Sequence, residues 1–149
     1  MRRIDASGLV GASSVEVWDL FDDIAGTPRW MPFVRDIAAV SGPARVGMVY
    51  TERRRTFGLP TTETWEIVEH RRPKVQARVS DLAGLERTLV LTLEQRGSGT
   101  LVHVQLELRS LMPGPAGWIY EWLAGIPGGW AIRAAIHGAK RAFEGRRPS

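Results

Sequence analysis

Charged side chains alternate with apolar ones in several segments, which is typical of strands with one face turned towards a core. Glu63 shares a face with Trp65, and Arg87 shares one with Leu89 and Leu91. Because side chains of a strand alternate between its two faces, these charged groups fall on the apolar side. Charged groups among aromatic and aliphatic ones could bind or polarise the polar part of an otherwise apolar ligand.

Tyr50, Glu52 and Arg54 alternate in the same way in the segment 48–57. A buried carboxylate costs several kcal/mol, roughly, unless a cation lies beside it. We therefore expect Glu52 or Glu63 to meet Arg54 or Arg87. Two interpretations stay open: cross-strand ion pairs at a wet end of the sheet, or groups that contact a ligand.

The segment 112–141 predicts a long C-terminal helix. Its large residues recur at steps of three or four, which predicts one stripe that faces the sheet: Trp118, Trp122, Ile126, Trp130, Ala134, His137 and Arg141. Tyr120 and Arg133 are expected near the same inner face. The run Gly125-Ile126-Pro127-Gly128-Gly129 predicts a kink or an interruption.

Histidine is the side chain best suited to general acid/base chemistry near neutral pH, which makes His137 a catalytic candidate. A lone helix histidine that is merely hydrogen-bonded is the alternative. The three histidines, His70, His103 and His137, are not at ligand spacing on one element, so no metal site is expected. No nucleotide-binding or hydrolase motif is present, and no cofactor is predicted.

The elements that must hold these residues alternate with turn signals. Strands are predicted at 1–10, 34–41, 48–57, 61–69, 74–80, 85–95 and 101–111. A capping box at Ser13 and Glu16 starts a short helix, and a second short helix or hook follows, in which Trp30 and Phe33 would cap the core or a pocket. On 74–80 the alternation places Val75, Ala77 and Val79 inward, with Asp81 beyond them. Strands beside segregated helices predict an α+β fold with an antiparallel meander.

Composition narrows the class of protein. The chain has 149 residues, 44% of them hydrophobic, which suits one domain (1–143) followed by a disordered tail (144–149). It has no cysteine, which suits a reducing cytoplasm. No signal peptide or integral membrane segment is visible. The net charge of +4 comes from dispersed arginines without interleaved aromatic residues, so nucleic acid is not an expected partner.

The order of motifs resembles the START-like, or helix-grip, superfamily and its bacterial polyketide cyclase/dehydrase and lipid-transport (SRPBCC) branch. The matching segments are Val15 to Asp23, the hook Trp30-Met31-Pro32, Gly47, Thr64 to Glu69 with Pro73, and Gly99 to Val102. The resemblance implies a curved antiparallel sheet of about seven strands around a long, kinked C-terminal helix, with two short helices after the first strand.

This resemblance implies a protein that binds a hydrophobic small molecule such as a lipid, polyketide or quinone. The alternatives are a polyketide aromatase/cyclase or a protein-interaction module, and a homodimer stays open. The candidate ligand contacts are Trp30, Phe33, Arg54, Trp65, Arg87, Leu89, Leu91, Tyr120, Trp122, Trp130 and Arg133. The candidate acid/base residues are His137, Glu63, Glu52 and Tyr50.

Overall fold

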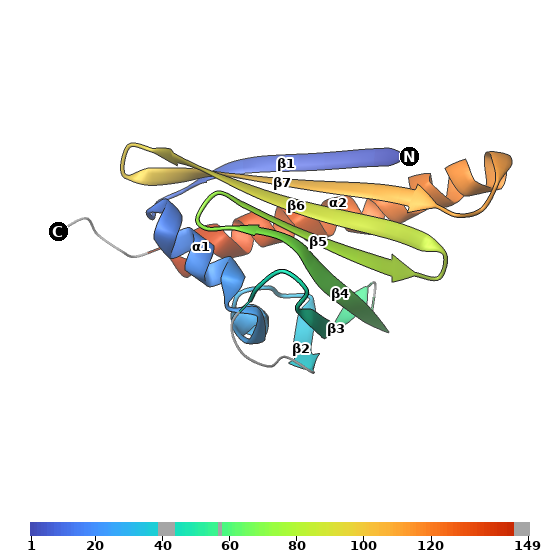
Figure 1. The fold of residues 1–149 in the computed structure, drawn as a ribbon, viewed down its shortest axis with the longest axis horizontal. Coiled ribbons are helices and arrows are strands. Elements are labelled where there is room, and N and C mark those ends of the chain that lie inside the picture. Colours follow the sequence, from blue (N-terminus) through green and yellow to red (C-terminus); the bar gives the residue numbers. More distant parts are fainter. Residues whose placement is uncertain (39–43, 57, 145–149) are drawn as a thin grey trace.

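A seven-stranded antiparallel sheet and one long helix make up most of the molecule (Figure 1). The computed structural model describes residues 1–38, 44–56 and 58–144. The sheet order is β1-β7-β6-β5-β4-β3-β2, so every strand after β1 pairs with its neighbour in sequence and β1 closes on β7. The strands are β1 (Arg2–Val10), β2 (Val34–Ala38), β3 (Val49–Thr56), β4 (Leu59–Arg71), β5 (Val75–Leu82), β6 (Leu85–Arg96) and β7 (Gly99–Ser110).

Three helical segments accompany the sheet: α1 (Ser14–Asp22), the 3-10 helix η1 (Ile24–Arg29) and α2 (Gly114–Ala142). The capping box predicted for the first helix is confirmed, since Ser13 accepts from the Glu16 N–H and Glu16 reaches back to the Ser13 N–H. The curved α+β architecture predicted from the sequence is confirmed. The end of the predicted strand 34–41 and the tail after Glu144 lie outside the described residues.

Helix α2 continues without interruption through Pro127, so the interruption that the run 125–129 left open is wrong, while the kink stays a prediction. The glycines of this run serve close packing instead. A Cβ at Gly128 would lie 2.7 Å from Leu106 Cδ2 on β7, and one at Gly125 would meet the Arg2 guanidinium. Helix α2 therefore approaches β1 and β7 closely. No helix of the described ranges is both long and apolar enough to cross a membrane.

The inner face of α2 is not the tryptophan stripe that the sequence predicts. Small and branched residues face the sheet, among them Gly125, Gly128, Ile132, Ala135 and Ile136. The large residues face outward, and Trp118, Trp122, Ile126 and Trp130 are all exposed. The prediction was wrong because bulk was taken as the sign of the buried face, whereas a closely packed helix needs small residues there.

Alanine substitutions at two glycines of α2 should have opposite effects on stability. A Cβ at Gly138 would overlap the backbone carbonyl of Trp30. A Cβ at Gly129 would make ordinary van der Waals contacts, with Arg133 Nη1 and Nη2 at 3.5 Å and Ile4 Cγ2 at 3.7 Å. We expect Gly138→Ala to lower the unfolding free energy by about 1–3 kcal/mol through overpacking. Gly129→Ala should raise it by about 0.5–1 kcal/mol, because alanine favours helix. Urea unfolding of both variants checks this, and equal effects would contradict the packing described here.

Two apolar clusters form the core and meet beneath β6. One joins α1, β6, β7 and α2, and the other joins η1, β3 and β4 around Tyr50, Trp65 and Ile67. Leu89 packs against both clusters. Because α2 packs against the β1 and β7 side of the sheet, the junction of the two clusters is only partly filled.

Candidate functional site

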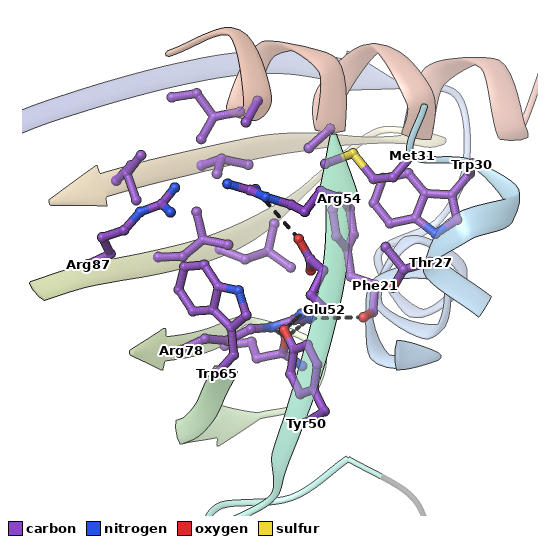
Figure 2. A pocket seen from close by; sticks show the side chains of 18 residues that line it. Phe21, Thr27, Trp30, Met31, Tyr50, Glu52, Arg54, Trp65, Arg78 and Arg87 are labelled. Atoms are coloured by element: carbon purple, nitrogen blue, oxygen red, sulfur yellow. Dashed lines mark hydrogen bonds and ion pairs between the residues drawn. The ribbon is translucent and has the colours of Figure 1, made fainter. Parts of the chain in front are cut away.

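A cavity of about 90 Å³ lies at this junction, between β3–β7, the segment around η1, and α2. Its apolar walls include Phe21, Trp65, Leu89, Leu91, Ile132 and Ala135. Figure 2 shows charged side chains among them: Glu52 and Arg54 from β3, Arg78 from β5 and Arg87 from β6. Trp30 and Met31, just after η1, close another side.

Four charged residues form a linked network beside the cavity. Arg87 Nη1 donates to both carboxylate oxygens of Glu63, at 2.7 Å for Oε2. Arg54 lies 3.5 Å from Glu52 Oε1 and 3.7 Å from Glu63 Oε2. Glu63 is only 1% exposed. The pairing expected from the sequence is therefore confirmed, and Arg54 links the two carboxyl groups.

A second polar cluster surrounds Arg78. Its Nη1 donates to the Tyr50 hydroxyl at 2.6 Å, its Nη2 donates to the Phe21 carbonyl at 3.0 Å, and its Nε donates to Gln76 Oε1 at 2.7 Å. Gln76 in turn donates to Asp22 Oδ1 at 2.9 Å. These bonds hold the guanidinium in place beside the Tyr50 ring and the cavity.

Burial changes the acid/base behaviour of three residues here. It raises the pKa of the Glu52 carboxyl, an effect that Arg54 partly opposes. It also raises the pKa of the Tyr50 hydroxyl, with Arg78 acting against it, and lowers the pKa of Arg87, with Glu63 acting against it. The site therefore favours a protonated Glu52 more than water does, and such a carboxyl can donate a proton or a hydrogen bond.

The raised pKa of Glu52 predicts a dependence of stability on pH. The folded protein holds this proton above the ordinary carboxyl value of 4.5, so the stabilisation is complete below that pH and is lost as the pH rises through the folded-state pKa. Glu52→Gln cannot ionise, so we expect its unfolding free energy relative to wild type to increase above about pH 4.5 and to level off beyond the folded-state pKa of Glu52. Urea unfolding between pH 4 and 8 measures this.

The control for this measurement is Glu66→Gln, the same change at an exposed carboxylate on the outer side of β4. The pH profile of Glu52→Gln is compared with that of Glu66→Gln over the same range. Identical profiles for the two variants would show that burial of Glu52 adds no cost to its ionisation.

Two further hollows adjoin the cavity, and Arg54 lines all three. One, of about 340 Å³, lies between Phe33 and the Pro127–Trp130 part of α2. The other, of about 170 Å³, lies beside Glu63, Arg87 and Tyr120. Since ligand pockets usually have volumes of about 300–1,000 Å³, the inner cavity alone is small, and Arg54 lines both it and the larger hollow beside Phe33.

The structure brings most of the predicted site residues together. Trp30, Tyr50, Glu52, Arg54, Trp65, Arg87, Leu89 and Leu91 line the cavity. Glu63 and Tyr120 line the 170 Å³ hollow, and Phe33 and Trp130 line the 340 Å³ hollow. The roles of these residues in binding or catalysis stay predictions.

Three predicted residues lie elsewhere. Trp122, Arg133 and His137 are exposed on α2, and the expected placement of Arg133 and His137 near its inner face is wrong. His137 lines a separate surface hollow beside Trp30 and Met31. None of the residues of the predicted stripe lines the cavity, which α2 reaches through Ala131, Ile132 and Ala135.

The sequence also missed Gln76 and Arg78. It placed Val75, Ala77 and Val79 inward, but Gln76 and Arg78 line the cavity, and Asp81 is exposed. The register explains this, because Gln76 pairs with Leu91 and Arg78 pairs with Leu89, whose side chains point inward. Strand β5 carries its polar residues on the inner face, so a prediction from hydrophobicity alone chose the wrong face of the strand.

Comparison with known proteins identifies the family. The model that describes polyketide cyclase / dehydrase and lipid transport proteins matches residues 1–144. The chain belongs to this family. The search of curated proteins found no match to this chain.

Solved structures of similar fold include proteins from several sources. The di-domain ARO/CYC BexL from the BE-7585A biosynthetic pathway has a TM-score of 0.76 and 18% identity, over 97% of this chain and 48% of that one. This family member therefore spans about half of BexL. TTHA0849 from Thermus thermophilus has a TM-score of 0.76 and 14% identity, over 94% and 95% of the two chains. The Zhui aromatase/cyclase from Streptomyces sp. R1128 has a TM-score of 0.73 and 14% identity, over 97% and 96%. Identities this low establish the shared fold alone.

Proposed function

We propose that this protein binds a hydrophobic small molecule that carries polar oxygen atoms, such as a lipid, polyketide or quinone-like compound. The observation that carries the proposal is the cavity between the sheet and α2, which has apolar walls and guanidinium groups at Arg54, Arg78 and Arg87. Apolar burial stabilises a ligand by about 25 cal/mol per Å². The guanidinium groups would fix the position of its oxygens.

The charges of the cavity favour an oxygen-bearing ligand over a plain hydrocarbon. Arg87 Nε is buried and has no hydrogen-bond partner within the described ranges. A buried donor without a partner costs about 1–3 kcal/mol, so a ligand oxygen that reached it would be bound favourably. The three cavity arginines outnumber the nearby carboxyl groups of Glu52 and Glu63, and burial favours the neutral form of Glu52.

A movement of Arg54 would give such a ligand more room beside the cavity. The contacts of Arg54 to Glu52 and Glu63 are 3.5 and 3.7 Å long, which is longer than a good charged hydrogen bond. If the side chain turned towards the hollow beside Phe33 and Trp130, the inner cavity would join that larger space. The ligand would then extend from the cavity towards the surface of α2.

A direct test is titration with the neutral fluorophore N-phenyl-1-naphthylamine, together with native mass spectrometry of the purified protein. We expect saturable binding of one probe molecule, with enhanced fluorescence, or a co-purified small molecule that the probe displaces. No saturable probe binding and no bound molecule in the mass spectrum would overturn the proposal.

Catalysis of polyketide cyclisation is the second candidate, and the environment of Glu52 favours it. A carboxyl group with a raised pKa beside Arg54 could protonate the alkoxide that forms when an enolate carbon attacks a ketone. The Tyr50–Arg78 pair could polarise a second carbonyl. In assays with a poly-β-ketone thioester analogue, Glu52→Gln should abolish turnover while the probe still binds. Unchanged turnover would remove Glu52 from this role.

A further inference from the structure

Helix α2 presents a large apolar surface to solvent. On its outer face, Trp118 is 63% exposed, Leu123 is 59% exposed, and Ile119, Trp122 and Ile126 are 42–51% exposed. We call these five residues the aromatic patch. Leu111 and Met112, in the turn before α2, are also exposed. In Figure 1 this end of α2 lies at the same end of the molecule as the N-terminus and extends past the strands.

The packing of α2 does not require these residues to be large and apolar. The opposite face of the helix makes the contacts to β1 and β7 through its glycines and through Ile132 and Ile136. A contiguous exposed surface of tryptophan, isoleucine and leucine is unusual in a soluble monomer and marks an interaction site. The patch therefore indicates a partner that covers it.

Within the described residues, helix α2 exposes positive charge and no negative charge. The exposed charged residues on the described part of α2 are Arg133, Lys140 and Arg141. Glu121, the one acidic residue of the helix sequence, is buried and accepts a hydrogen bond from the Ser110 N–H at 2.8 Å. The Arg2 guanidinium lies 4.5 Å from the Trp122 ring centroid. A partner that fits this face must be apolar and carry negative charge.

An anionic lipid bilayer has both properties, because negative headgroups cover its apolar acyl chains. Tryptophan rings favour the boundary between headgroups and acyl chains, while arginine and lysine bind lipid phosphates. A helix of this kind lies in the plane of the surface without crossing it. A second copy of the chain fits less well, because it would bring the same cations and no exposed carboxylate from the described residues of its α2.

We propose that the aromatic patch of α2 docks this protein on anionic membrane surfaces. The hollow between Phe33 and the Pro127–Trp130 part of α2 adjoins the patch. Docking would place this hollow at the lipid surface, so an apolar ligand could enter from the bilayer without crossing water. The docking itself rests on the outer face of α2 and does not depend on what the cavity binds.

Co-sedimentation with vesicles tests the proposal. We expect the protein to sediment with phosphatidylglycerol/phosphatidylcholine vesicles, to show a blue shift of tryptophan emission, and to bind pure phosphatidylcholine at least tenfold more weakly. The double variant Trp118→Gln/Trp122→Gln should lose at least tenfold in binding to the anionic vesicles. Raising the salt to 0.5 M should also weaken binding, because screening reduces the attraction of exposed charges.

The control is Leu9→Gln, which changes a leucine of 58% exposure on β1 and should leave vesicle binding unchanged. Titration with N-phenyl-1-naphthylamine in the double variant separates this proposal from the proposed function, since probe binding should persist. Absence of binding to anionic vesicles, or equal binding by the double variant, would overturn the proposal. Analytical ultracentrifugation without lipid tests the alternative partner. If the wild-type protein is a dimer and the double variant is a monomer, the patch binds a second copy of the chain instead.

Discussion

Glu63→Leu is expected to lower the free energy of unfolding by about 3–5 kcal/mol, the usual effect of removing one partner from a buried ion pair. Glu63 is 1% exposed and accepts two hydrogen bonds from Arg87, with Arg54 at 3.7 Å. Without this carboxylate, two guanidinium groups would share a site whose remaining acid is Glu52. Burial already lowers the pKa of Arg87, so its charge would be costly there.

The double variant Glu63→Leu/Arg87→Met separates a lost ion pair from lost packing. It removes both charges and keeps similar side-chain volume, so it should be more stable than the Glu63→Leu single variant. Urea unfolding of the four proteins gives the coupling energy, which we expect to be about 2 kcal/mol or more. Additive effects of the two single substitutions would show that the pair contributes no interaction of its own.

An exposed ion pair provides the matched control. Arg3 Nη2 lies 3.0 Å from Glu107 Oε1, across β1 and β7, and both side chains are in contact with solvent. Such pairs contribute about 0–1 kcal/mol, so Glu107→Leu should have a small effect. A loss as large as that of Glu63→Leu would show that burial is not what makes the inner pair important.

The sequence predicted the inner charges of β3, β4 and β6 because each lies in a strand with large apolar residues on the same face. Glu63 alternates with Trp65, and Arg87 with Leu89 and Leu91. In these strands, hydrophobicity and register agree. The paired network could be predicted because a buried carboxylate requires a cation, whatever the details of packing.

The same reasoning failed where the face with the larger apolar residues is not the face that lines the interior. In β5, Val75 and Val79 look like core residues, yet the register with β6 turns Gln76 and Arg78 inward. In α2, the small residues face the sheet. Both errors have the same cause. The sequence of one strand or helix does not show which surface packs against it, and that surface decides which face is buried.

Ala135→Leu is expected to weaken binding of N-phenyl-1-naphthylamine at least tenfold. Ala135 lies on the inner face of α2 and lines the cavity, whose volume is about 90 Å³. The extra carbon atoms of leucine would occupy this space directly. Overpacking of this kind costs about 1–3 kcal/mol of stability, so circular dichroism must first show that the variant is folded at the assay temperature.

Ala134→Leu is the matched control, because it makes the same change one residue earlier, where the side chain lines the surface hollow with His137 and not the cavity. Its probe affinity should equal that of wild type. If both variants bound the probe normally, the probe would sit outside the cavity, and the aromatic patch would be its next candidate site. If only Ala135→Leu lost probe binding, the loss would come from filling the cavity side of α2. A general change in the helix would be excluded, because both variants replace an alanine by a leucine.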